Sequence, residues 1–365
     1  MTRRLLGCLM LLTLSAPSGA AELEVETLTA GLEYPWSLAF VDEGDLLITE
    51  RPGRLRRFRD GQLSEPIQGL PEVYAAGQGG LLEVLLDPDF ASNQRVYLSY
   101  AHGSPEANAT RVARARLHGT QLIDLEVIFT ARPWKNTPVH YGGRMCFRAD
   151  GTLMLGLGDG FDYREAAQDL SSDLGKIIRI HPDGVIPENN PMADRRGALG
   201  EIYSYGHRNV QGMACDPGSN RLIAHEHGPR GGDELNQIVA GGNYGWPLAT
   251  FGLDYSGAQI SPFTKIERSR QPLTHWTPSI APSGMAVVRG EMFKAWEGDL
   301  LITALAARAL YRVRLEGRRV IESEQLLTEL DERLRDVRVG PDGAVYLLTD
   351  SAQGRLLRVG PAPSP

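Results

Sequence analysis

RDVRVGPDGAVYLLTDSAQGRLLRV (335–359) is the stretch that decides the fold of this chain. It holds an apolar strand-like run, a Pro-Asp-Gly turn, a second run, a loop and a third run. WSLAFVDEGDLLITERPGRLRRF (36–58) repeats this order near the other end of the chain. Short apolar runs between such turns, with almost no helical periodicity, are typical of all-β folds. The two stretches therefore predict an antiparallel unit that the chain uses repeatedly.

Four further copies of the unit lie between these two, at 81–100, 143–180, 211–228 and 283–315. Copies spaced by roughly 45 to 75 residues fit four-stranded propeller blades with insertions. We predict an all-β, six-bladed β-propeller that forms a single domain over residues 22–365. A β-sandwich or a β-helix would not place an Asp-Gly type of turn after the first strand of every unit. The long insertions 160–175, 186–200 and 229–282 are expected to be surface loops.

Composition and the N-terminus limit the possible functions. The chain has 365 residues, 42% of them hydrophobic and 23% charged, as in a soluble globular protein. A formal net charge of -7 gives no basic face, so we expect no nucleic-acid partner. Residues 1–21 combine two arginines, a short apolar run and small residues, which indicates a signal peptide and a periplasmic or secreted protein. That run is too short to span a bilayer, and the oligomeric state stays open as monomer or dimer.

Two cysteines, Cys146 and Cys215, remain after removal of the signal peptide. They could pair in an oxidising compartment. Each lies inside an apolar strand-like run, however, and free cysteine is among the most buried residue types. We expect two buried thiols.

Polar residues gather where one mouth of the propeller is expected. Residues just before first strands and in loops after second strands meet at the same end of the channel. These residues are Gln78, His140, Arg208, Asn209, Ser283, Arg333 and Arg335 before first strands, and Asp159, His227 to Glu234, Arg308 and Asp350 after second strands. Four arginines, amides and glycine-rich loops suit a flat, oxygen-rich polyanion. The carbonyls and carboxylates of Gly228, Pro229, Asp233 and Glu234 suit a hard cation such as calcium.

Simpler explanations remain open for several of these residues. Asp159 and Asp350 are typical of turns, in which the carboxylate caps backbone groups. Arg335 is followed by an aspartate and could form a surface ion pair. Asp233 and Glu234 could merely solvate a loop.

A set of phrases runs through nearly the whole chain in order, including GQGGLLEVLLDPDF, GGRMCF, GKIIRIHPDG, GHRNVQG, EHGPRGGDELN, GGNYGWP, APSGMAV and RLRDVRVGPDG. This set resembles the soluble aldose sugar dehydrogenases that depend on pyrroloquinoline quinone (PQQ), within the soluble glucose and sorbosone dehydrogenase family. The resemblance implies a six-bladed propeller and an enzyme that oxidises aldoses at C1 to lactones. Hydride would pass to the quinone, and the reduced cofactor would pass electrons to an acceptor that stays unidentified.

The resemblance also implies roles for individual residues. Those implied to contact PQQ are Gln78, Arg208, Asn209, Tyr255, Arg333 and Arg335. The carbonyls of Gly228 and Pro229 would bind the calcium that bridges protein and quinone, while Glu234 and the carbonyl of Tyr244 would bind a second, structural calcium. His140 matches the general base, and Arg208 would draw electron density from the quinone.

Three positions depart from the soluble glucose dehydrogenase pattern. Ala306 replaces a lysine that contacts the cofactor, and Arg308 is a candidate substitute for it. His227 replaces a glutamine. Val139 replaces an aspartate beside the base, which predicts a broad range of aldoses, disaccharides included.

Two other functions could use the same fold but fit the predicted polar residues less well. A calcium-dependent, lactonase-like hydrolase would gain nothing from four arginines at the mouth. A non-catalytic carbohydrate-binding propeller would favour exposed aromatic platforms, and only 7% of the residues are aromatic.

Overall fold

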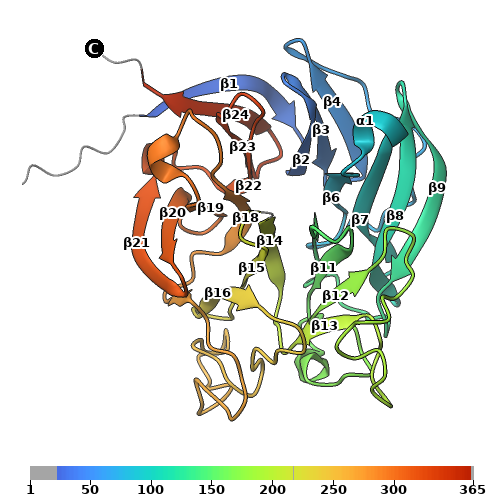
Figure 1. Cartoon of the computed structure of the whole chain (residues 1–365), viewed down its shortest axis with the longest axis vertical. Coiled ribbons are helices and arrows are strands. Elements are labelled where there is room, and N and C mark those ends of the chain that lie inside the picture. Colours follow the sequence, from blue (N-terminus) through green and yellow to red (C-terminus); the bar gives the residue numbers. More distant parts are fainter. Residues whose placement is uncertain (1–22, 217, 363–365) are drawn as a thin grey trace, which may run out of the picture.

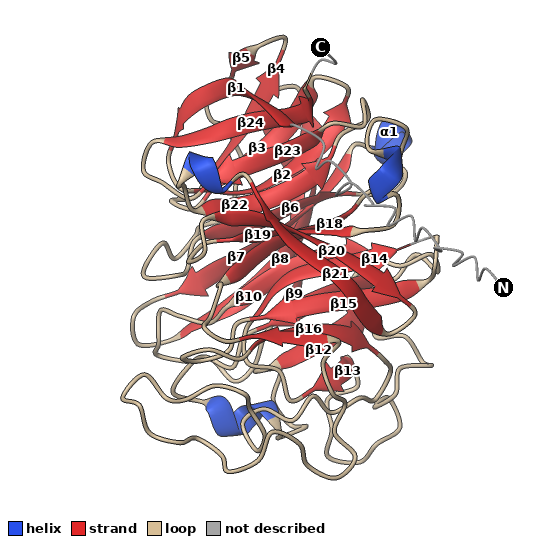
Figure 2. Cartoon of the chain, turned by 90° about the vertical axis from the view of Figure 1, so that its left-hand side faces the viewer, coloured by secondary structure: helices blue, strands red, loops and turns tan. Residues whose placement is uncertain are grey.

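Six four-stranded antiparallel sheets form a ring in the computed structural model, which describes residues 23–216 and 218–362 (Figure 1). The prediction of an all-β, six-bladed propeller is confirmed. Strand is the dominant structure, and the helices in the described part of the chain are α1 (Phe90–Asn93) and short 3-10 turns at Arg164–Ala167, Lys294–Trp296 and Thr328–Leu330 (Figure 2). The expected signal peptide lies outside the described residues.

Each of the first five blades follows the predicted repeat, with its strands in sequence order from the channel outward. The first three blades are β2 (Pro35–Asp42), β3 (Asp45–Glu50), β4 (Arg54–Arg59) and β5 (Gln62–Leu63); β6 (Leu81–Leu86), β7 (Arg95–Gly103), β8 (Asn108–His118) and β9 (Gln121–Thr130); and β10 (Gly142–Phe147), β11 (Leu153–Leu157), β12 (Lys176–Ile180) and β13 (Ile202–Tyr205). The next two are β14 (Val210–Asp216), β15 (Arg221–Glu226), β16 (Asp233–Ile238) and β17 (Thr274–Trp276); and β18 (Pro282–Val287), β19 (Leu300–Ala304), β20 (Ala309–Glu316) and β21 (Arg319–Leu326).

The sixth blade joins the two ends of the chain. It contains β22 (Leu334–Val339), β23 (Val345–Thr349), β24 (Gly354–Pro361) and, as its outermost strand, β1 (Leu23–Leu32). The blue β1 runs antiparallel along the red β24 in Figure 1, from Leu23 opposite Pro361 to Leu32 opposite Gly354. Because this pairing covers the last edge of the C-terminal strands, it closes the ring.

The hydrophobic core lies between neighbouring blades. Leu47 of the first blade packs with Leu81 and Leu98 of the second, and Leu301 of the fifth packs with Leu347 of the sixth. Middle strands are buried on both faces, which explains why they are continuous apolar runs. Each fully buried side chain of this kind contributes about 1.5–3 kcal/mol.

Arg144 of β10 fastens the inner strands across the channel. Its Nε donates to the carbonyl of Gln211 at 2.8 Å, and its Nη2 donates to the carbonyls of Ser283 and Arg335 at 3.1 and 3.3 Å. Its Nη1 lies 3.0 Å from the Asp336 carboxylate. One buried side chain thus connects the first strands of four blades.

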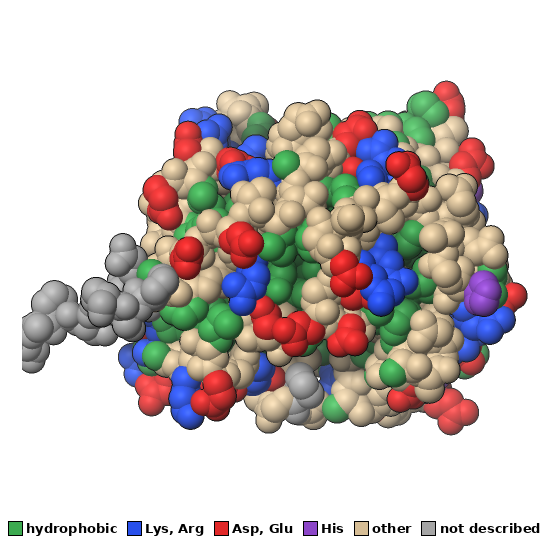
Figure 3. All heavy atoms as spheres, turned by 90° about the horizontal axis from the view of Figure 1, so that it is seen from above, with side chains coloured by type: hydrophobic (Ala, Val, Ile, Leu, Met, Phe, Trp, Pro, Cys, Tyr) green, Lys and Arg blue, Asp and Glu red, His purple; other side chains and the backbone are tan. Residues whose placement is uncertain are grey.

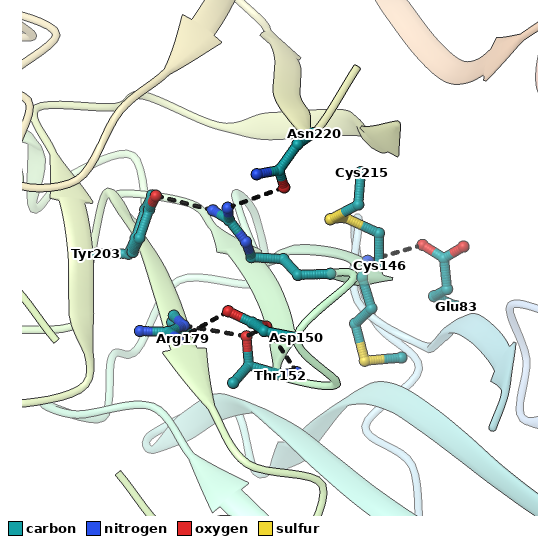
Figure 4. The surroundings of a disulfide bond; sticks show 10 residues. Glu83, Cys146, Asp150, Thr152, Arg179, Tyr203, Cys215 and Asn220 are labelled. Carbon is teal, nitrogen blue, oxygen red and sulfur yellow. Dashed lines mark hydrogen bonds and ion pairs between the residues drawn. A yellow bond between two sulfur atoms is a disulfide. The ribbon is translucent and has the colours of Figure 1, made fainter. Parts of the chain in front are cut away.

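Cys146 and Cys215 form a disulfide, with an S–S distance of 2.07 Å (Figure 4). The expectation of two buried thiols was wrong. The cysteines lie on β10 and β14, the first strands of adjacent blades, with their Cα atoms 5.8 Å apart. That separation suits a disulfide, and a sequence separation of 69 residues gave no sign of it.

The predicted insertions form the loops at the bottom of Figure 1, but one of the three is not a loop throughout. Segment 186–200 contains no strand, and 160–175 contains only the turn Arg164–Ala167. Segment 229–282 is not wholly a loop, because it supplies β16 and β17, the outer strands of the fourth blade.

Charges of both signs are spread over the surface. Acidic and basic side chains are intermixed on the face seen in Figure 3, without a continuous basic area. In the described part of the chain, no helix has the length and apolar character needed to cross a membrane.

Candidate functional site

A cavity of about 210 Å³ opens where the predicted polar residues converge. Gln78 precedes β6, Asn209 precedes β14, and Arg333 and Arg335 lie at the start of β22. The full lining is Trp36, Arg51, Gln78, Leu82, Tyr141, Gly142, Asn209, Gln211, His227, Ala281, Leu305, Arg333, Arg335 and Asp350. Four of the predicted cofactor contacts therefore share one cavity.

Positive charge exceeds negative charge in this cavity. Arg333 and Arg335 share the carboxylate of Asp350, at 3.0 and 3.2 Å. Burial opposes ionisation of Asp350, but the two arginines hold its pKa below the usual range. Arg335 is buried, its Nε has no hydrogen-bond partner among the described residues, and burial lowers its pKa. A buried donor without a partner calls for an explanation, and an anionic ligand would supply one.

A second cavity, of about 190 Å³, contains two further predicted contacts. Arg208 and Tyr255 line it, with the guanidinium carbon 5.8 Å from the tyrosine ring centre. Tyr255 is 59% exposed, so its ring is free to cover a flat ligand. Pro229 also lines this cavity, and Arg208 Nη1 donates to the carbonyl of Gly228 at 2.6 Å.

His140 is held from two sides between β9 and β10. Its backbone N–H donates to Gln78 Oε1 at 2.9 Å, and its Nδ1 lies 2.6 Å from Asp159 Oδ1. A carboxylate at Nδ1 keeps the proton on that nitrogen and leaves a lone pair on Nε2. Burial is the main cause that lowers the pKa of His140 below 6.5, and Asp159 opposes this shift. The imidazole is therefore neutral near pH 7, as a base must be.

Asp159 does more than the turn residue that the sequence suggested. It does cap a backbone group, because Oδ1 accepts from the N–H of Phe161 at 2.8 Å. Its other oxygen accepts from Trp246 Nε1 at 2.8 Å. With His140, three donors fix this buried carboxylate beside the imidazole.

The predicted calcium ligands fall into two groups. Asp233 is not available as a ligand, because it accepts from the backbone N–H groups of Gly228, Ile280 and Ala281 at 2.8–2.9 Å. It braces the loop that presents the Gly228 and Pro229 carbonyls.

Glu234 and Tyr244 line a small cavity together with Glu226. Burial and the charge of Glu226 raise the pKa of Glu234 to about 8. A divalent cation would relieve this repulsion, so the donor set fits calcium. Among the described residues, no three His, Cys, Asp or Glu side chains gather as a metal-binding group.

Arg308 does not join the cavity. It is half exposed, and its Nη1 lies 2.9 Å from Asp331 Oδ1. Leu305 and Ala281, and not Arg308, line the cavity near Ala306. Arg51 also lines the cavity, and the sequence analysis missed it. It directly follows β3, the second strand of its blade, so the expectation that loops after second strands reach the mouth could have found it.

Comparisons with known proteins agree with this geometry. The family model for glucose/sorbosone dehydrogenases matches residues 32–358. The chain belongs to this family. Aldose sugar dehydrogenase YliI of Escherichia coli K12 is 44% identical over 349 residues, which cover 93% of this chain and 94% of YliI. The predicted family is confirmed.

Solved structures show the same fold. A crystal structure of glucose dehydrogenase is 48% identical, with a TM-score of 0.90, and covers 92% of this chain and 99% of its own. The PQQ-bound form of aldose sugar dehydrogenase from Streptomyces coelicolor is 32% identical, with a TM-score of 0.76, over 93% of this chain and 99% of its own.

Proposed function

We propose that the protein is a PQQ- and calcium-dependent aldose sugar dehydrogenase that oxidises aldoses at C1 to lactones. One observation carries the proposal: in a cavity rich in arginine, Arg335 Nε has no hydrogen-bond partner among the described residues, and Gln78 of the same cavity binds the backbone of a histidine held by a carboxylate. Family membership and the PQQ-bound relative support the same chemistry.

The residues present fit the cofactor. Arg333, Arg335 and Gln78 would hold its carboxylates, while Arg208 and Tyr255 would contact the ring from the adjoining cavity. The carbonyls of Gly228 and Pro229 would hold one calcium, and Glu234 with the carbonyl of Tyr244 a second. When bound, the quinone supplies a two-electron hydride acceptor and the calcium polarises it.

The protein's own part in the reaction is proton transfer and positioning. His140 Nε2 takes the proton of the anomeric hydroxyl, and Asp159 stabilises the imidazolium that forms. The C1 hydrogen leaves with its electron pair, so the sugar loses one proton and one hydride and becomes the lactone. Val139, in place of an acid beside the base, favours a broad range of aldoses. We further propose that the protein is exported and delivers electrons to an acceptor outside the cytoplasm.

Reconstitution tests the proposal. Purified apoprotein should reduce an artificial acceptor dye with aldoses only after addition of both PQQ and calcium. Cleavage of lactones or esters without the quinone would instead favour a propeller hydrolase. Sugar oxidation that survives exhaustive chelation and needs no quinone would contradict the proposal.

A further inference from the structure

Lys135 is a buried lysine beneath the base. It lies between β9 and β10 and is only 2% exposed. Its Nζ donates to Asn108 Oδ1 at 3.0 Å and to the carbonyl of Thr137, and lies 3.5 Å from the centre of the Tyr141 ring. It makes no ion pair with a carboxylate of the described residues. Burying an ammonium without such a partner is costly, so the position calls for a functional reason.

Lys135 contacts both of the loops that carry His140 and Asp159. Thr137, whose carbonyl accepts from Lys135, also donates through its hydroxyl to the carbonyl of Gly160 at 2.6 Å. Gly160 follows Asp159 and packs on the lysine stem so closely that a Cβ there would lie 2.8 Å from Lys135 Cδ. Tyr141 follows His140 and receives the ammonium on its ring face. The charge is thus held between the His140 loop and the Asp159 loop.

Few charged groups act on His140 and Lys135. His140 feels the charges of Asp159, Arg208 and Lys135, and Lys135 feels that of Asp159. Burial lowers the pKa of Lys135 to about 7 and that of His140 below 6.5. As the pH falls, Lys135 gains its charge before His140 does. A like charge nearby then disfavours protonation of the imidazole.

We propose that Lys135 is a positioning residue that keeps His140 unprotonated in mildly acidic solution, by holding a positive charge under the loops that carry His140 and Asp159. The inference rests on the proposed role of His140 as the base. The charge of Lys135 extends the pH range of activity to lower pH, although Lys135 does not contact the substrate.

The test is a titration of the apoprotein by NMR. The chain has 8 histidines and only four lysines, Lys135, Lys176, Lys265 and Lys294, so selective 13C labelling gives few signals. His140→Gln assigns the His140 signal. In Lys135→Met, which removes the charge and keeps the stem, the His140 midpoint should rise by roughly 0.5–1 pH unit. The acidic limb of kcat/KM in the reconstituted enzyme should move upward with it.

Lys176→Met is the matched control. Lys176 is equally buried, donates to the carbonyls of Ala166 and Leu174 at 2.7 Å, and has its pKa lowered by burial to about 7. Its charge is not among the main influences on the pKa of His140. The His140 midpoint should therefore stay unchanged in this variant.

Two results would overturn the inference: an unchanged His140 midpoint in folded Lys135→Met, or an equal shift in Lys176→Met. If Lys135→Met does not fold, the wild-type titration serves as the test. The inference requires the midpoint of His140 to lie at lower pH than that of Lys135, and the reverse order would contradict it. The titration needs neither quinone nor sugar. A failure of this inference is therefore distinct from a failure of the proposed dehydrogenase activity.

Discussion

Replacing Asp159 by asparagine should slow sugar oxidation while leaving the cofactor cavity intact. Asp159 Oδ1 accepts from His140 Nδ1 and from the Phe161 N–H, and Oδ2 accepts from Trp246 Nε1. An asparagine oxygen can keep the first two bonds, but its NH2 group then meets the Trp246 donor. The tautomer of His140 survives, and what is lost is the charge that stabilises the imidazolium.

The size of the effect follows from that lost charge. A hydrogen bond to a charged group contributes about 1.5–3 kcal/mol, which corresponds to about 10 to 200-fold in kcat if the imidazolium is fully formed in the transition state. Because Asp159 raises the pKa of His140, its loss should also move the acidic limb of the pH profile to lower pH.

Steady-state kinetics at saturating quinone, calcium and aldose would measure both effects. Trp246→Phe is the control, because it removes the third donor and keeps the Asp159–His140 pair. Trp246 also lines the second cavity, so its effect should appear in PQQ affinity, while kcat at saturating quinone should stay within a few-fold of wild type. A wild-type kcat in Asp159→Asn, or an acidic limb that moves to higher pH, would refute the assignment of Asp159.

Three further changes probe the base, the anion cavity and the fold. His140→Ala should lower kcat by roughly 10² to 10⁴-fold with PQQ still bound, and near-wild-type turnover would remove it from the base role. Arg335→Met should weaken PQQ binding at least about tenfold, since a buried charged donor loses its ligand; titration by fluorescence quenching should show no such loss in Arg308→Met, and equal effects would contradict the cavity assignment. Replacing both Cys146 and Cys215 by serine removes the disulfide and should lower the free energy of unfolding, measured in urea, by about 2–4 kcal/mol. An unchanged urea midpoint would show that the disulfide adds no stability.

The sequence predicted the fold well because the propeller is a local pattern repeated. Each blade carries its own turns and alternating strands, so the copy at 335–359 was enough to recognise the other five. The same logic placed Gln78, Asn209, Arg333 and Arg335 at one mouth, because the ends of inner strands meet there whatever the loops do.

What the sequence could not show were contacts between blades and the state of buried groups. Asp159 has the signature of a turn, and only the folded chain brings its second oxygen to Trp246 and its first to His140. The disulfide joins strands of adjacent blades that are 69 residues apart in the chain. Lys135 carried no motif, because the cost of burying its charge exists only after the loops have closed over it.

Single-turnover reduction of the bound quinone tests the central claim most directly. Protein reconstituted with PQQ and calcium is mixed anaerobically with an aldose, and the absorbance of the quinone is followed while the lactone is quantified. The account predicts one lactone formed for each quinone reduced, at a rate that collapses in His140→Ala although the quinone stays bound. Quinone that remains oxidised in the presence of every aldose tested, or lactone formed without reduction of the quinone, would contradict it.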